Sequence, residues 1–261
     1  MFLDTERVRY DKSQILEVIC QLRFPTILSV GAREPVDFQE LIRQDFPRYS
    51  RNVEKQPPKI SGQPGNMQVQ EQPEVINHQF LSADGKWKVN ITNGFLALAT
   101  PAYTCWEDFA AKLDEVLCHF IAVYKPAYFE RIGLRYINAI SRKGLGLEDT
   151  PFSELIQPGY LGLMAEEDVS ERAFARIMQE CEVKLPGGCS LKLHCGPGMI
   201  KRNNVEDKEI RFILDNDLFM LGKIEVKHCA AALMTVHTHA DRVFRGAITD
   251  MLHNAMEPRS L

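Results

Sequence analysis

Two arginines flank a glycine in one apolar stretch of the chain. The stretch FERIGLRYINAI, residues 129–140, places Arg131 and Arg135 on either side of Gly133. In a strand these three residues share a face, with the arginines about 13 Å apart and Gly133 leaving space between them. Planar guanidinium groups at that spacing suit a phosphate or carboxylate ligand. The alternative, which we favour, is a ladder of ion pairs, because buried charges need partners.

A second stretch offers partners for this ladder. Residues 15–24, ILEVICQLRF, alternate apolar and polar side chains as a strand does. If this strand lies beside the arginine stretch, Glu17 can face Arg135 and Arg23 can face Arg131. Glu17 is therefore a charge-network candidate, and Arg23 is a further candidate for binding an anion.

Two aspartates could also do chemistry. Asp215 and Asp217 fall on one face of the expected strand EIRFILDND, together with Arg211. Two carboxylates at this spacing can hold Mg²⁺ for phosphodiester cleavage. No third acid or histidine stands in a recognisable motif, so we interpret all three residues as members of the arginine charge network.

A cluster of thiols and one imidazole surrounds an expected hairpin. Cys181, Cys189, His194 and Cys195 follow the spacing C-x7-C-x4-H-C, which lacks the paired C-x-x-C knuckles of structural zinc sites. Cys181 and Cys195 are expected on the apolar faces of their strands, as core cysteines are. We therefore expect no metal there.

The last helix carries two histidines and an acid. His237 and His239 are about 200° apart on a helix, so they do not face one ion together. His237 and Asp241, four residues apart, suit a charge relay, but no nucleophile accompanies them, and we interpret them as a polar helix face. The chain contains no G-x-S-x-G, P-loop, G-x-G-x-x-G or H-E-x-x-H motif. We expect no catalytic residues and no cofactor.

The elements that position these residues fall into two halves. The first half predicts a strand, a helix, a long polar loop and a meander with hairpin turns at Asp84-Gly85 and Asn93-Gly94. A helix follows the capping-box pattern Thr104-x-x-Glu107. The expected ranges are a strand at 15–24, a helix at 36–46, a loop at 50–73 and a helix at 106–120.

The second half repeats this order of elements. It predicts a strand containing the two arginines, a short helix, an antiparallel strand pair turning at Gly187-Gly188, an exposed loop, a strand containing the aspartates and a final helix. The expected ranges are strands at 129–140, 173–185, 190–195 and 209–217, helices at 152–156 and 236–252, and a loop at 201–208.

The fold class that follows is α+β. Residues 1–126 and 127–261 each read β-α-β-β-β-α, which indicates two pseudo-repeats in one continuous domain that shares a sheet. We expect a curved antiparallel sheet backed by two long helices, and the saddle of TATA-binding-protein-like folds is the nearest analogy. Such an analogy carries no function with it.

Composition narrows the class of protein. The 261 residues are 45% hydrophobic and 25% charged with a net charge of −4, so no overall basic field favours nucleic acid or anionic lipid. We expect no signal peptide, and no apolar run reaches the roughly 18 residues that span a bilayer. Seven scattered cysteines are typical of reduced thiols. We expect a cytoplasmic protein that does not enter a membrane.

Several short motifs resemble a known family. Tyr10-Asp-Lys12, Glu17-Val18 and Leu22-Arg23-Phe24, followed by the string RIGLRYIN at 131–138, are similar to a sporadically distributed, uncharacterised bacterial family of about 250 residues. The resemblance covers nearly the whole chain. It implies no activity and no catalytic residues. Its patchy distribution implies a role in phage defence, including CRISPR-type systems, or in mobile elements.

Three functions remain open from the sequence. The first is a non-enzymatic binding or accessory protein that acts through protein contacts, with a protein partner and a possible homodimer. The second is a nucleic-acid-binding module or metal-dependent nuclease that uses Arg131, Arg135, Asp215 and Asp217, although the net charge does not favour it. The third is a protein that holds a small anionic ligand at the arginines.

Overall fold

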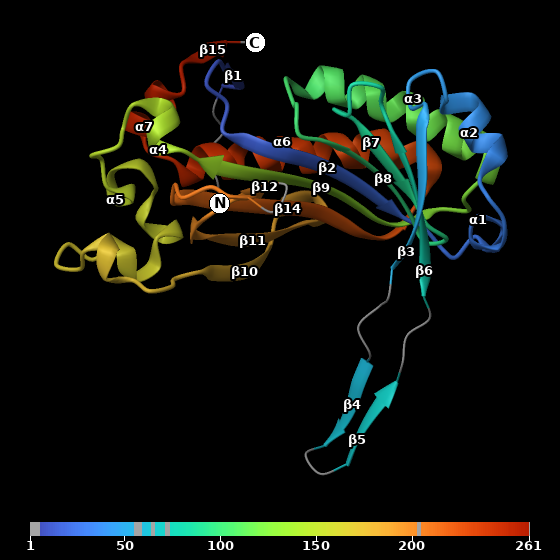
Figure 1. The fold of residues 1–261 in the computed structure, drawn as a ribbon, viewed down its shortest axis with the longest axis horizontal. Helices are drawn as coiled ribbons and strands as arrows, with labels where there is room; N and C mark the ends of the chain where they lie inside the picture. The colour runs from blue at the N-terminus through green and yellow to red at the C-terminus, as the bar shows by residue number, and fades with distance from the viewer. Residues whose placement is uncertain (1–5, 55–58, 64–65, 71–73, 203–204, 261) are drawn as a thin grey trace.

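One antiparallel sheet dominates the fold (Figure 1). The computed structural model describes residues 6–54, 59–63, 66–70, 74–202 and 205–260. Within that part of the chain, nine strands form the main sheet, and the α+β class is confirmed. In spatial order the strands are β10 (Gln179–Lys184), β11 (Cys189–Gly198), β14 (Arg211–Ile224), β9 (Phe129–Ile140), β2 (Ile15–Arg23), β8 (Phe95–Thr100), β7 (Lys88–Ile91), β6 (Val75–Leu81) and β3 (Arg48–Glu54).

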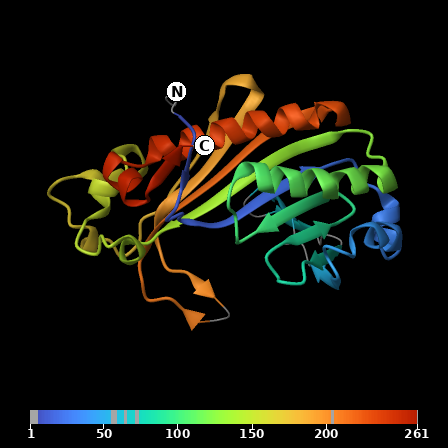
Figure 2. The same ribbon diagram turned by 90° about the horizontal axis from the view of Figure 1, so that it is seen from above.

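Two long helices lie along one face of this sheet (Figure 2). They are α3 (Trp106–Tyr124) and α6 (Cys229–Ala247), and α6 packs on β9 and β14. The apolar stripe predicted for α3 is confirmed, because its buried residues are Trp106, Phe109, Leu113, Val116, Leu117 and Phe120. The shorter helices are α1 (Leu28–Ala32), α2 (Val36–Ile42), α4 (Arg142–Leu145), α5 (Phe152–Leu155) and α7 (Asp250–Ala255). Short 3₁₀ turns are η1 (Pro158–Tyr160), η2 (Gly162–Ala165), η3 (Glu171–Ala173), η4 (Pro186–Gly188) and η5 (Val226–His228).

Strand alternation decides which side chains meet the helices. In β9, Ile132, Leu134 and Tyr136 are buried on the helix side, so Arg131 and Arg135 point the other way, because successive side chains alternate between faces. We call the face opposite α3 and α6 the open face. The functional candidates of β9 and β14 belong to it.

The two strands that carry most of the sequence motifs lie side by side. β2 pairs antiparallel with β9 at the middle of the sheet, with Cys20 opposite Leu134 and Arg23 opposite Arg131. This adjacency is the one expected from the sequence. It brings apolar side chains of both strands into one core beneath the helices.

An arm of two strands stands away from the main sheet (Figure 1). Its strands β4 (Lys59–Gln63) and β5 (Asn66–Gln70) pair with each other and form a sheet of their own. The long loop predicted at 50–73 is therefore wrong where the structure describes it. β3 pairs with β6 along its full length. Its polar side chains are compatible with a strand because it lies at the edge of the sheet. The prolines at 57, 58, 64 and 73 lie outside the described residues.

Two further ribbons complete the strands. β1 (Val8–Tyr10) pairs with β15 (Pro258–Ser260), so segments near the two ends of the chain lie together, and β12 (Lys201–Arg202) pairs with β13 (Val205–Glu206) within the predicted loop at 201–208. Both predicted hairpins of the meander form, but not with the type I′ turns that the dipeptides favour. Gly85 alone of these four turn residues has a positive φ, of 74°.

Several predicted boundaries were wrong, and the helix expected at 36–46 ends at Ile42. The strand expected at 173–185 begins only at Gln179, where the ladder to β11 starts opposite Cys195. Gly196, the next residue of β11, has φ 150°, and a Cβ there would lie 2.7 Å from the carbonyl oxygen of Ile177. This close backbone approach replaces regular pairing.

The final helix is also interrupted. α6 ends at Ala247, and Ile248 is extended and forms a β-bridge with Ile156. Thr249 then caps α7 by accepting a hydrogen bond from the Leu252 amide at 3.3 Å. At the start of α3 the predicted capping box is wrong, since Cys105 is the N-cap and no side chain caps the helix. No helix in the described ranges is long and apolar enough to cross a bilayer.

Candidate functional site

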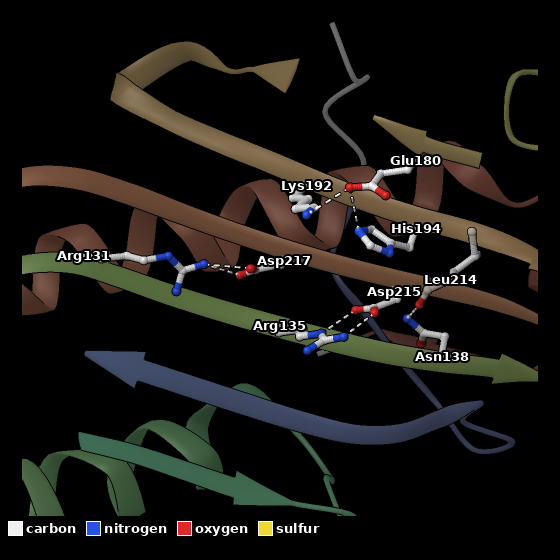
Figure 3. A network of polar contacts seen from close by, with 9 residues as sticks. All are labelled: Arg131, Arg135, Asn138, Glu180, Lys192, His194, Leu214, Asp215 and Asp217. Carbon is white, nitrogen blue, oxygen red and sulfur yellow. Dashed lines mark hydrogen bonds and ion pairs between the residues drawn. The ribbon is translucent and has the colours of Figure 1, made fainter. Parts of the chain in front are cut away.

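Arg131 and Arg135 both bind carboxylates of the neighbouring strand (Figure 3). Arg131 Nη2 donates to both carboxylate oxygens of Asp217 at 2.7 Å. Arg135 donates from Nε and Nη2 to the two oxygens of Asp215 at 2.6 and 2.5 Å. The side chains of Arg131 and Asp217 are only 15% and 27% exposed. Both arginines therefore already have the partners that the ladder interpretation requires.

Gly133 serves the ion pair of Arg131. The guanidinium of Arg131 crosses above Gly133, and a Cβ added to Gly133 would lie 2.1 Å from Arg131 Nη1. The same guanidinium lies 4.6 Å from the ring centroid of Phe219, in cation–π geometry. The space above Gly133 is thus filled by the Arg131 guanidinium, which leaves no room for an anion between the two arginines.

Charges of opposite sign alternate across four strands of the open face. The register places Lys192 of β11 opposite Asp217 and His194 opposite Asp215. On the edge strand β10, Glu180 Oε1 lies 3.0 Å from Lys192 Nζ and 3.4 Å from His194 Nε2. The hydrogen bond from Lys192 and the nearby positive charges lower the pKa of Glu180. Cross-strand pairs of this kind each stabilise a sheet by roughly 0.2–1 kcal/mol.

Two predicted members of the charge network, Arg211 and Glu17, and the predicted anion-binding candidate Arg23 lie elsewhere. Arg211 binds Asp207 and Glu209, at 2.5 and 2.9 Å, in the turn before β14 rather than the aspartates of the ladder. Arg23 is opposite Arg131 in the register, as expected, and these two like charges do not pair. Glu17 is opposite Ile137 and not opposite Arg135 as expected. Within the described residues neither Arg23 nor Glu17 is joined to an ion-pair partner.

Glu17 still acts on Arg135 at a distance. The hydrogen bonds that Arg135 donates to Asp215 raise the pKa of Arg135, burial opposes this rise, and the charges of Asp215, Asp217 and Glu17 add to it. Glu17 is therefore a weak electrostatic neighbour of Arg135 and not its direct partner.

The structure separates the residues of the zinc hypothesis. Cys195 is buried on the helix side, whereas His194 points to the open face, and Cys181 is exposed on the edge strand rather than in the core as expected. Across the part of the chain that the structure describes, no three or more histidine, cysteine, aspartate or glutamate side chains gather as metal ligands. Asp215 and Asp217 bind arginines instead.

A pocket on the helix side contains the functional candidates that the sequence did not predict. It lies between the N-terminal segment 7–15, the start of α3, β9 and α6, with a cavity volume of about 100 Å³. Its polar residues include His237 and Asp241 of α6. Its aromatic walls are formed by Tyr10, Tyr103, Trp106, Tyr136 and Phe244.

His237 is the central polar group of this pocket. Its side chain is 6% exposed and stacks on Trp106, with ring centroids 4.2 Å apart. His237 Nδ1 lies 3.3 Å from the Tyr136 hydroxyl, and Nε2 has no hydrogen-bond partner among the described residues. Burial lowers the pKa of His237 to about 4, assisted by the charge of Arg7, and burial raises the pKa of Asp241.

The interpretation of His237 and His239 as a polar helix face was wrong. Both side chains are buried, and they point to different neighbours, since His239 Nε2 lies 3.0 Å from the carbonyl oxygen of Pro186. The four-residue spacing of His237 and Asp241 was the only signal in the sequence. It could not show that the N-terminal segment and Trp106, more than a hundred residues away, enclose this face.

No protein-family model matches the chain, and a comparison with curated proteins finds no similar sequence.

Proposed function

We propose that this protein is a non-enzymatic binding or accessory protein that acts through protein contacts, and that the β4–β5 arm is its main contact element. The arm is the single observation that carries the proposal. It is a two-stranded ribbon with a sheet of its own, and it stands apart from the nine-stranded sheet (Figure 1). A function through contacts explains why the chain places such a ribbon apart from its main sheet.

An isolated two-stranded hairpin is marginally stable in water. Its outer edges carry unpaired backbone N–H and C=O groups, which are templates for another strand. The register pairs Ile60 with Val69 and Gly62 with Met67, so apolar residue types occupy paired positions of the ribbon. A partner strand would satisfy the backbone groups and cover these positions.

The base of the arm offers more contact area. The arm continues from β3 and β6, and β3 is the edge of the main sheet. Tyr49 and Val53 of this edge strand are 41% and 46% exposed. A partner held by the arm would therefore also meet an open sheet edge with exposed apolar side chains.

The first partner we propose is a second copy of the chain. Most soluble oligomers are symmetric homo-oligomers, and a two-fold axis beside the arm would place the same ribbon edge against itself. The two ribbons would then form one four-stranded sheet. The resemblance to a patchily distributed bacterial family supports a role for this assembly in phage defence or a mobile element of the cytosol.

We also propose that the two halves descend from one duplicated unit in a saddle-like arrangement. The strand order supports this. Outward from the central β2 and β9, the order is β8, β7, β6 on one side and β14, β11, β10 on the other. In each half the chain passes from a central strand to an outer strand and returns strand by strand toward the centre. β3 is the one strand of the main sheet that has no counterpart in the other half.

The alternatives have less support. Arg131 and Arg135 are occupied by Asp217 and Asp215, which removes both the anion donors and the metal ligands that the nuclease and anion-binding hypotheses require.

The experiment is removal of the arm. Glu54 and Val75 are directly opposite in the register, so a two-residue Asn-Gly turn in place of residues 55–74 closes the hairpin there. Sedimentation equilibrium on the full chain should show a dimer, and the arm-less variant should be a monomer with an unchanged circular dichroism spectrum.

A second ribbon supplies the matched control. The Asp207 amide donates to the Ile200 carbonyl at 2.9 Å, so Asn-Gly can likewise replace residues 201–206 and remove β12 and β13. This variant should remain dimeric. A monomeric full chain at micromolar concentrations, or an arm-less variant that still dimerises, would contradict the assignment of the arm.

A further inference from the structure

We infer that the pocket around His237 binds a small, neutral, planar one-ring molecule that carries a carbonyl acceptor beside an N–H donor. A heteroaromatic lactam is the simplest such compound. This site uses none of the arm, so its test is independent of the function proposed above.

The unpaired Nε2 of His237, a residue that lines the pocket, suggests that a ligand binds there. A buried polar atom without a partner costs roughly 1–3 kcal/mol, and Nε2 is in that state among the described residues. His237 is neutral at pH 7, because its pKa is about 4. We assign the tautomer in which the Tyr136 hydroxyl donates to Nδ1, which places the proton of the neutral ring on Nε2. The ligand must therefore present an acceptor.

Asp241 supplies the complementary group. It lies four residues after His237 on α6, and residues at this spacing share one helix face with Cβ atoms about 5–6 Å apart. Both residues line the pocket. A lactam presents its carbonyl and its N–H side by side, so it can accept from His237 and donate to Asp241 at the same time.

The walls decide the shape and size of the ligand. Five aromatic side chains enclose the cavity, and its volume of about 100 Å³ is close to that of apolar cavities of about 150 Å³ that bind benzene. Aromatic walls favour a planar ring. The volume of the cavity is therefore suited to a single ring.

The pocket has a cover that is held in place by contacts of its own. Arg7 of the N-terminal segment binds Glu107 of α3 at 3.1 Å. Tyr10 lies with its hydroxyl 2.7 Å from His253 Nδ1, and its ring contacts Phe244 edge to face at 6.0 Å. Segments near both ends of the chain thus line the pocket and hold one side of it in place.

Charge around the pocket favours a neutral ligand. Arg7 is already paired with Glu107, and the charge of Arg9, which also lines the pocket, acts on Asp108. Asp241 would repel a carboxylate placed beside His237. Burial raises the pKa of Asp241, which shows that a charge is disfavoured there. A neutral carbonyl satisfies Nε2 without adding a charge to this environment.

The probe for the test is 2-pyridone, a one-ring lactam, and its N-methyl derivative is the matched compound without the donor. Full-length protein with ¹⁵N-labelled histidine is titrated with each. The His237 Nε2 signal, assigned by its loss in His237→Phe, should shift saturably with millimolar 2-pyridone. N-methyl-2-pyridone should bind about tenfold more weakly, the loss of one hydrogen bond.

Variants separate the site from a general effect on folding. His237→Phe preserves a ring against Trp106 but removes the donor, and it should weaken 2-pyridone binding about tenfold. His239→Gln, at the other buried histidine of α6, should leave binding unchanged. The proposal is overturned if wild-type protein shows no saturable shift, if His237→Phe binds as tightly as wild type, or if N-methylation of the probe has no effect.

Discussion

The ion pair of Arg131 and Asp217 permits a direct test of whether the open-face arginines are structural. The perturbation is a double-mutant cycle with Arg131→Met and Asp217→Asn. Each single change leaves one partly buried group without its partner, and the double variant removes the interaction from both sides. If the pair is structural, the losses of stability in the two single variants add up to more than the loss in the double variant.

The magnitude follows from exposure and geometry. One guanidinium nitrogen donates to both carboxylate oxygens at 2.7 Å, and Arg131 and Asp217 are 15% and 27% exposed. Hydrogen bonds to charged groups contribute about 1.5–3 kcal/mol, and partial exposure places this pair below the cost of breaking a fully buried one. We expect Asp217→Asn to lower the free energy of unfolding by about 2 kcal/mol, and a coupling energy of about 1–2 kcal/mol.

Urea unfolding monitored by circular dichroism measures these energies, and the thermal midpoint should fall by about 4–8 °C for a chain of this size. The control cycle uses Glu180 and Lys192, whose side chains are 58% and 43% exposed. Its coupling energy should be below about 1 kcal/mol.

One result would refute the structural interpretation. If Asp217→Asn leaves stability unchanged and confers saturable binding of inorganic phosphate, then Arg131 is an anion-binding residue and Asp217 competes with the anion for it. A coupling energy no larger than that of the control cycle would lead to the same conclusion.

Three further predictions test the packing of the fold. Gly133→Ala should cost about 2 kcal/mol, because its Cβ displaces the Arg131 guanidinium from its carboxylate, and the cost should disappear in an Arg131→Ala background. The pKa of His237 is about 4 in the folded chain against 6.5 unfolded, so the unfolded state binds more protons between these values. Stability should therefore fall by about 3 kcal/mol as pH drops from 6.5 to 4, and His237→Phe should flatten this part of the urea-midpoint profile. Thr249→Val removes the cap of α7 and should cost about 1–2 kcal/mol in the same assay without moving the ends of α6.

Local sequence patterns were sufficient for most elements. Period-two alternation located β2 and β9, and the three-four spacing of apolar residues located α3, because each pattern reflects a periodicity of the backbone itself. The polar residues of β3 concealed a strand, since an edge strand needs no apolar alternation. The break after Ala247 depends on a backbone bridge to Ile156, which no local pattern records.

The candidate sites divide in the same way. The sequence by itself determined that Arg131 and Arg135 share a strand face and that Asp215 and Asp217 are acids available to them, because side-chain alternation follows from the covalent chain. Only the tertiary structure decided that β14 lies beside β9, which turns a possible anion site into two ion pairs. It also decided that the segment around Tyr10 covers His237, since enclosure depends on contacts between residues more than two hundred positions apart.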